Sequence, residues 1–181
     1  MIKTILIFIL LFTLDNLLGI LLPLRSLFGG GYTAVPYLTL IGFCIHTFFD
    51  EENHLLWVAF AFGLVYDMFG ANLLGLYAAL FPLIVFMIKK YIVTVTPINF
   101  ISLFYIVTVI ILAVETIIYL LVIIITPRTT TPWAFIQYRL VVTIVFNTVL
   151  LAIIYPLMIR ILKPKKRNKK VKNIMKGNTH A

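Results

Sequence analysis

Long apolar runs, separated by short polar connections, fill most of residues 2–162. Several of these runs reach or approach the ~20 residues that an α-helix needs to cross the hydrocarbon core of a bilayer. Charged residues make up 12% of the chain and hydrophobic residues 62%, so a single small core could not hide the apolar surface from water. The runs are continuous, whereas barrel strands alternate apolar and polar residues in short segments. The sequence therefore predicts an all-α, polytopic membrane protein.

Proline, glycine and short polar clusters divide the apolar sequence into six predicted transmembrane helices. These helices cover approximately residues 2–22, 32–49, 55–69, 72–87, 97–125 and 133–162. Pro36 would fall in the first turn of the second helix, where proline is tolerated. The first run is too long for a signal peptide and contains Asp15, so we expect a retained helix. The predicted organisation is a six-helix membrane domain over residues 1–162 and a basic tail over residues 163–181.

Basic residues are concentrated near the C-terminus. Nine of the fifteen lysines and arginines lie between Arg160 and Lys176. Six helices place both termini on one side of the membrane, together with Lys3, Lys89 and Lys90, and the positive-inside rule makes that side cytoplasmic. The tail is expected to contact anionic lipid headgroups, at roughly 1 kcal/mol per basic residue, and an acidic protein partner is the alternative. Nucleic acid is not an expected partner, because no folded reader or aromatic platform accompanies the charge.

The apolar stretch 59–82 contains one acidic residue, Asp67, among several small residues. Gly63 precedes Asp67 by four positions, so the two share one face of a helix. Gly75 begins a second face of small residues on the following helix. Because small residues let helix backbones approach closely in lipid, the two helices are expected to pack tightly.

The connection inside this stretch is predicted to be a tight turn between antiparallel helices. Gly70 suits the position just after a helix, and Asn72 suits an N-cap. The predicted role of Asp67 is to accept backbone N–H groups at the start of the second helix, where the helix dipole favours an anion. Proton or ion movement, a contact with a partner and an internal ion pair are the alternatives.

Four further polar residues lie inside predicted helices. Arg139 and Asp15 lie at similar predicted depths from the outer surface, as does Asp67. We expect Arg139 to pair with one of these two carboxylates, because a lone buried charge is costly; snorkelling to the outer headgroups is the alternative. Glu115 lies nearest the centre of its helix and is expected to make a structural hydrogen bond. Asn147 is expected to form an interhelical hydrogen bond.

Sequence motifs of enzymes and metalloproteins are missing from the chain. There is no phosphate-binding glycine loop, no Ser/His/Asp set and no pair of metal ligands at a recognised spacing. We therefore expect no catalytic residue, no cofactor and no metal site.

Residues 63–80, GLVYDMFGANLLGLYAAL, resemble the central motif of the rod shape-determining MreD family. The matching positions are Gly63, Asp67, Leu74, Gly75 and Ala78, and Ala79 stands where the family often has Leu. The loop 126–132 (TPRTTTP), Asn147, Tyr155–Pro156, Asp15 and the basic terminus are also similar to that family.

This resemblance implies a non-catalytic scaffold of the bacterial cell-elongation machinery in the cytoplasmic membrane. Such a protein would bind MreC, act beside MreB and the RodA–transpeptidase pair, and help control cell shape and lateral peptidoglycan synthesis. The resemblance also implies a fold similar to the substrate-binding subunit of energy-coupling-factor transporters. Asp67 would then define the shape of the protein or face MreC.

Two other functions are alternatives. A vitamin-binding subunit of an energy-coupling-factor transporter would need a small-xxx-small pattern on the first helix, which residues 5–21 do not carry. A lipid-pathway enzyme or flippase would require a polar central cavity, for which Asp15, Glu115 and Arg139 are few.

Overall fold

The computed structural model describes residues 2–21, 32–49, 54–69, 75–93, 99–125 and 131–162, and these ranges contain helices and no strand. The elements are α1 (Ile2–Leu21), α3 (Leu38–Phe49), α4 (His54–Phe69), α5 (Leu76–Met87) with the π-helix η1 (Ile88–Ile92), α6 (Phe100–Ile125), α7 (Pro132–Phe135), the π-helix η2 (Ile136–Leu140) and α8 (Val141–Leu162). Because η1 continues α5, and α7, η2 and α8 run on without a break, the described chain forms six helical rods, as predicted. The basic tail, residues 163–181, lies outside the described residues.

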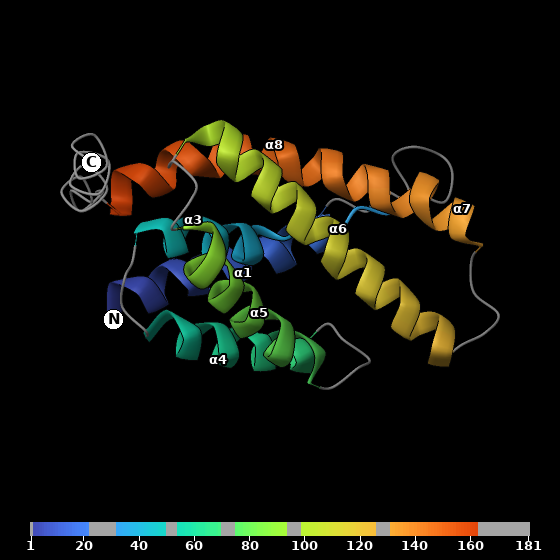
Figure 1. Ribbon diagram of the computed structural model, residues 1–181, viewed down its shortest axis with the longest axis horizontal. Helices are drawn as coiled ribbons and strands as arrows, with labels where there is room; N and C mark the ends of the chain where they lie inside the picture. The colour runs from blue at the N-terminus through green and yellow to red at the C-terminus, as the bar shows by residue number, and fades with distance from the viewer. Residues whose placement is uncertain are drawn as a thin grey trace, which may run out of the picture.

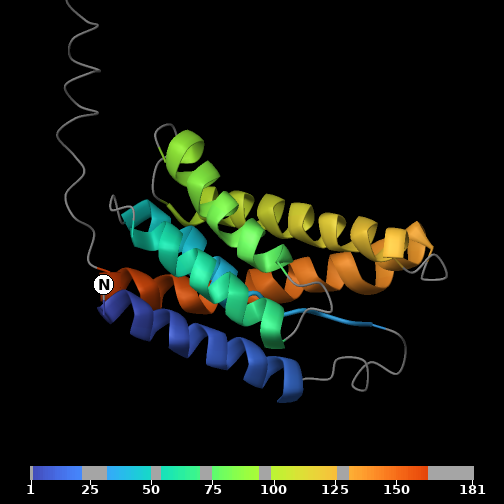
Figure 2. The same cartoon turned by 90° about the horizontal axis from the view of Figure 1, so that it is seen from below.

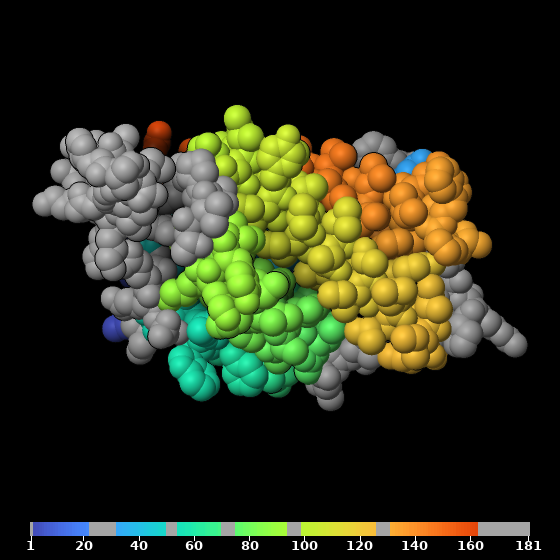
Figure 3. Space-filling model, viewed as in Figure 1, coloured from blue at the N-terminus to red at the C-terminus, as the bar shows by residue number. Residues whose placement is uncertain are grey.

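Three of these rods are long and apolar enough to cross a membrane. They are Ile2–Leu21, Phe100–Ile125 and Pro132–Leu162, with 20, 26 and 31 residues. Large apolar side chains on α6 and α8 are exposed, among them Tyr105 and Val145. Figure 3 shows α6 in yellow and α8 in orange on one face of the molecule. Such exposed surface suits contact with lipid rather than water.

The short helix α3 forms the centre of the bundle. It lies between α8 and the hairpin of α4 and α5 (Figure 1), and every residue from Leu38 to Phe48 is buried. Its twelve residues span only about 18 Å at the usual rise of an α-helix. That length is below the ~30 Å thickness of the hydrocarbon core, so one end of α3 must lie inside the protein.

The second predicted helix was wrong at its start. It begins at Leu38 rather than Tyr32, and residues 32–37 belong to no helix, so Pro36 is not in a helical turn. Figure 2 shows these residues as an extended segment. Proline disfavours the helical conformation of the residue before it, here Val35. The extended segment lies along η2 and α8 (Figure 2), which supply its hydrogen bonds.

The helices α4 and α5 form the predicted antiparallel hairpin. A Cβ atom added at Gly63 would lie 2.6 Å from the Cα and 2.7 Å from the N of Ala78, so glycine permits this close approach. The start of α5 differs from the prediction: its N-cap is Gly75 rather than Asn72. Gly75 has φ +93°, a left-handed conformation that glycine adopts without steric cost. Gly70 and Asn72 lie outside the described residues.

The first and last described helices meet at one end of the bundle. Lys3 Nζ donates a hydrogen bond to the carbonyl oxygen of Ile161 over 3.3 Å. The start of α1 therefore lies beside the end of α8, as Figure 2 also shows.

Candidate functional site

Asp15 of α1 caps the buried start of α3. The backbone N–H groups of Leu38 and Thr39 donate to its two carboxylate oxygens over 2.6 and 2.8 Å. The Tyr66 hydroxyl of α4 donates to the same carboxylate. The first N–H groups of any helix lack partners within that helix, and in apolar surroundings each needs an acceptor from elsewhere in the protein. Asp15, which is 4% exposed, thus fastens α1 and α4 to the central helix.

Asp67 plays the same part for α5. Its Oδ2 accepts the N–H groups of Gly75 and Ala78 over 3.1 and 3.0 Å, and its Oδ1 accepts that of Tyr77 over 2.9 Å. The predicted acceptance of backbone N–H groups at this helix start is therefore found. With Asp67 on α4 and its three donors at the start of α5, the carboxylate fixes how the two helices of the hairpin meet.

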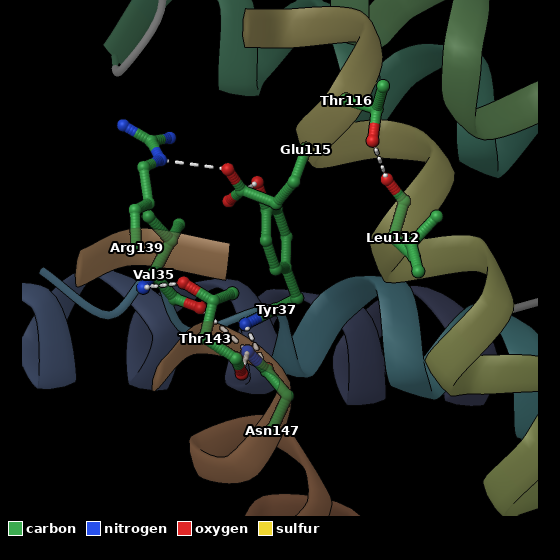
Figure 4. A network of polar contacts seen from close by, with 8 residues as sticks. All are labelled: Val35, Tyr37, Leu112, Glu115, Thr116, Arg139, Thr143 and Asn147. Atoms are coloured by element: carbon green, nitrogen blue, oxygen red, sulfur yellow. Dashed lines mark hydrogen bonds and ion pairs between the residues drawn. The ribbon is translucent and has the colours of Figure 1, made fainter. Parts of the chain in front are cut away.

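Asn147 of α8 supplies hydrogen bonds to the extended segment 32–37. Its Oδ1 accepts the N–H of Tyr37 over 2.8 Å, and its Nδ2 donates to the carbonyl oxygen of Val35 over 2.7 Å (Figure 4). Thr143, one turn earlier, accepts the N–H of Val35 over 3.3 Å. The predicted interhelical hydrogen bond was therefore wrong in its partner, because Asn147 bonds to the non-helical segment 32–37 rather than to another helix.

Glu115 of α6 joins two other elements. It accepts a hydrogen bond from the Tyr37 hydroxyl over 2.8 Å and pairs with Nε of Arg139 over 2.8 Å (Figure 4). The Glu115 side chain is fully buried and that of Arg139 is 37% exposed. The ion pair and the hydroxyl together neutralise and solvate a carboxylate that would otherwise be very costly in this place.

The predicted partner of Arg139 was therefore wrong, since the arginine pairs with Glu115 rather than with Asp15 or Asp67. Both aspartates already accept several hydrogen bonds at helix starts. The prediction considered only how deep each residue lies in the membrane. The pairing also depends on which helices are neighbours, and here α6 brings Glu115 next to Arg139 of η2.

These contacts form three polar clusters inside an apolar bundle: one around Asp15, one around Asp67 and one that joins Glu115 to Asn147 through Tyr37. We call their residues together the polar seam: Asp15, Tyr37, Tyr66, Asp67, Glu115, Arg139, Thr143 and Asn147. Sequence reasoning missed Tyr37, Tyr66 and Thr143. The spacing of Thr143 and Asn147 by four residues, which places both on one helix face, was a signal for the third. Nothing local to the two tyrosines distinguishes them from interfacial aromatic residues.

The polar seam stabilises the fold through contacts within the protein. Each of its three carboxylates accepts at least two hydrogen bonds or ion-pair contacts from the protein itself. Within the described ranges, no group of three or more His, Cys, Asp or Glu side chains could hold a metal ion.

Membrane-length apolar helices around an internally satisfied polar seam define a helical integral membrane protein. The model of one protein family, described as rod shape-determining protein MreD, matches residues 1–165. The chain belongs to this family, and so it is a cell-shape membrane protein associated with the rod-shape machinery. Comparison with curated proteins gave no match, and comparison with solved structures gave none either.

Proposed function

We propose that this chain is a non-catalytic scaffold of the bacterial cell-elongation complex. In this role it binds MreC, acts beside MreB, RodA and its transpeptidase, and helps control cell shape and lateral peptidoglycan synthesis. The observation that carries the proposal is the family match over residues 1–165, which covers all six helical rods.

The geometry of the polar seam supports a scaffold. Asp15 and Asp67 use both of their oxygens on backbone N–H groups, and Glu115 uses both on Tyr37 and Arg139. These groups hold short helices in fixed positions, and a fixed outer surface is what a binding partner needs. The same commitment argues against a role of Asp67 in proton or ion movement, because a carrier group must release its partners.

We further propose that the chain is a multi-pass protein of the bacterial cytoplasmic membrane, with both termini in the cytoplasm. The contact of Lys3 with Ile161 supports an even number of crossings, because it joins the first and last helices at one end. The basic tail that follows α8 supports a cytoplasmic location of that end and would contact anionic lipid. The family match lends no support to vitamin transport, and the likeness to energy-coupling-factor subunits stays a prediction.

Affinity purification of the tagged full chain from its own host in mild detergent tests this proposal. Mass spectrometry of the eluate should recover MreC well above an untagged control. Recovery of an ATPase-coupled transmembrane subunit in place of MreC would contradict the scaffold and favour transport.

A further inference from the structure

A groove of about 790 Å³ lies between the start of α4 and the end of the rod formed by α5 and η1. Its walls are apolar and aromatic, with Trp57 and Phe60 on one side and Leu83 and Phe86 on the other. All four side chains are more than two-fifths exposed. The volume falls within the ~300–1,000 Å³ of sites that hold small ligands.

One end of this groove is basic. Lys89 and Lys90 of η1 line it. The Lys90 ammonium lies 5.4 Å from the ring centroid of Phe86 and 5.1 Å from that of Tyr91, within reach of cation–π attraction. The two rings hold the positive charge at the edge of the groove, where the apolar walls end.

We propose that this groove binds an anionic phospholipid. The phosphate would meet Lys89 and Lys90, and an acyl chain would lie against Phe60, Leu83 and Phe86. An amphiphile with one negative end matches a site with apolar walls and one cationic end, and Trp57 suits the level of the headgroups. Given the orientation proposed above, the lipid belongs to the cytoplasmic leaflet. This site is separate from the basic tail.

Quenching of Trp57 by brominated lipid tests the site. The chain has two tryptophans, so Trp133→Phe leaves Trp57 as the only one. The full chain is reconstituted in phosphatidylcholine bilayers. One titration adds phosphatidylglycerol that is brominated on its acyl chains, and the control titration adds brominated phosphatidylcholine. Phosphatidylglycerol should quench Trp57 preferentially. Replacing both lysines with glutamine (K89Q/K90Q) should lower its relative affinity about thirty-fold, because each lysine near the surface contributes ~1 kcal/mol.

A matched variant separates the groove from the tail. K169Q/K170Q removes two tail lysines and should leave the preference at Trp57 unchanged. Native mass spectrometry of the purified chain should likewise show retained phosphatidylglycerol that K89Q/K90Q loses and K169Q/K170Q keeps. Retained folding of each variant is checked by the protection of Cys44, the single cysteine, which is fully buried.

Three results would overturn the proposal. Equal quenching by the two lipids would show that the groove does not select a negative headgroup. Equal loss in the two double variants would assign the preference to general surface charge. A photo-crosslinking residue at Phe86 that couples to a protein instead of a lipid would show a protein occupant. None of these measurements uses MreC, so their failure leaves the scaffold proposal standing.

Discussion

Replacing Asp67 with alanine should release the α4–α5 hairpin. The carboxylate is 3% exposed and accepts three backbone N–H groups, at Gly75, Tyr77 and Ala78. A buried donor left without an acceptor costs about 1–3 kcal/mol. Of the three donor residues only Ala78 is buried, so we assign about 2 kcal/mol to its N–H and about 1 kcal/mol to each of the other two, which gives a loss of about 4 kcal/mol for D67A. That is a large part of the ~5–15 kcal/mol that stabilises a typical folded protein.

The buried cysteine provides the assay. Cys44 lies in α3, is fully buried and is the only cysteine, so a maleimide dye reports unfolding of the core. In a thermal scan in detergent, D67A should lower the labelling midpoint by about 10 °C, at ~2–4 °C per kcal/mol for a chain of this size. The labelling midpoint of D67N should lie between those of D67A and wild type. An asparagine keeps one acceptor oxygen but turns an amide N–H toward a backbone N–H.

Asn16→Ala is the matched control for this measurement. Asn16 is a polar residue of α1 that is exposed and donates only to a carbonyl oxygen of its own helix over 2.9 Å. Its replacement should change stability by less than about 0.5 kcal/mol. If D67A shifted the midpoint no more than N16A does, the N–H groups of α5 would have other acceptors, and the assignment of Asp67 as their cap would be refuted.

The same labelling assay tests three other contacts. Gly63→Ala should destabilise by about 1–3 kcal/mol because the new methyl meets the backbone of α5, whereas Gly19→Ala, with nothing within 4 Å, should be neutral or stabilising; equal effects would exclude a close helix approach. For the pair Glu115 and Arg139, E115Q/R139Q should cost less than the sum of the single changes by about 1–3 kcal/mol, and strict additivity would deny the ion pair. Asn147→Ala should cost about 2–4 kcal/mol, because it removes an acceptor and a donor of the extended segment, and a cost below about 0.5 kcal/mol would mean that this segment is held otherwise.

The helical rods could be predicted from sequence because the signal for each is local. A continuous apolar run of about twenty residues permits few structures in a membrane, and the runs that became α1, α6 and α8 are of this kind. The cap formed by Asp67 was also predictable, since the acceptor lies on α4 and the donors begin the next helix along the chain.

The remaining contacts depend on residues far apart in the sequence. Residues 32–37 run directly into the apolar helix that follows them, and the hydrogen bonds that hold them come from Asn147, more than a hundred positions away. The pairing of Glu115 with Arg139 likewise depends on which helices become neighbours. Asp15 gave no local sign that it would cap α3, because the loop between them leaves the approach of the two helices open.

Depletion of this chain from its host, with re-expression from a controlled promoter, tests the central claim most directly. Cell width and the position of new wall synthesis, marked by a fluorescent D-amino acid, are measured as the protein disappears. The scaffold account predicts that cells widen and round, that lateral incorporation becomes scattered, and that wild-type chain restores both. Cells that keep their rod shape while becoming dependent on an added vitamin would contradict it.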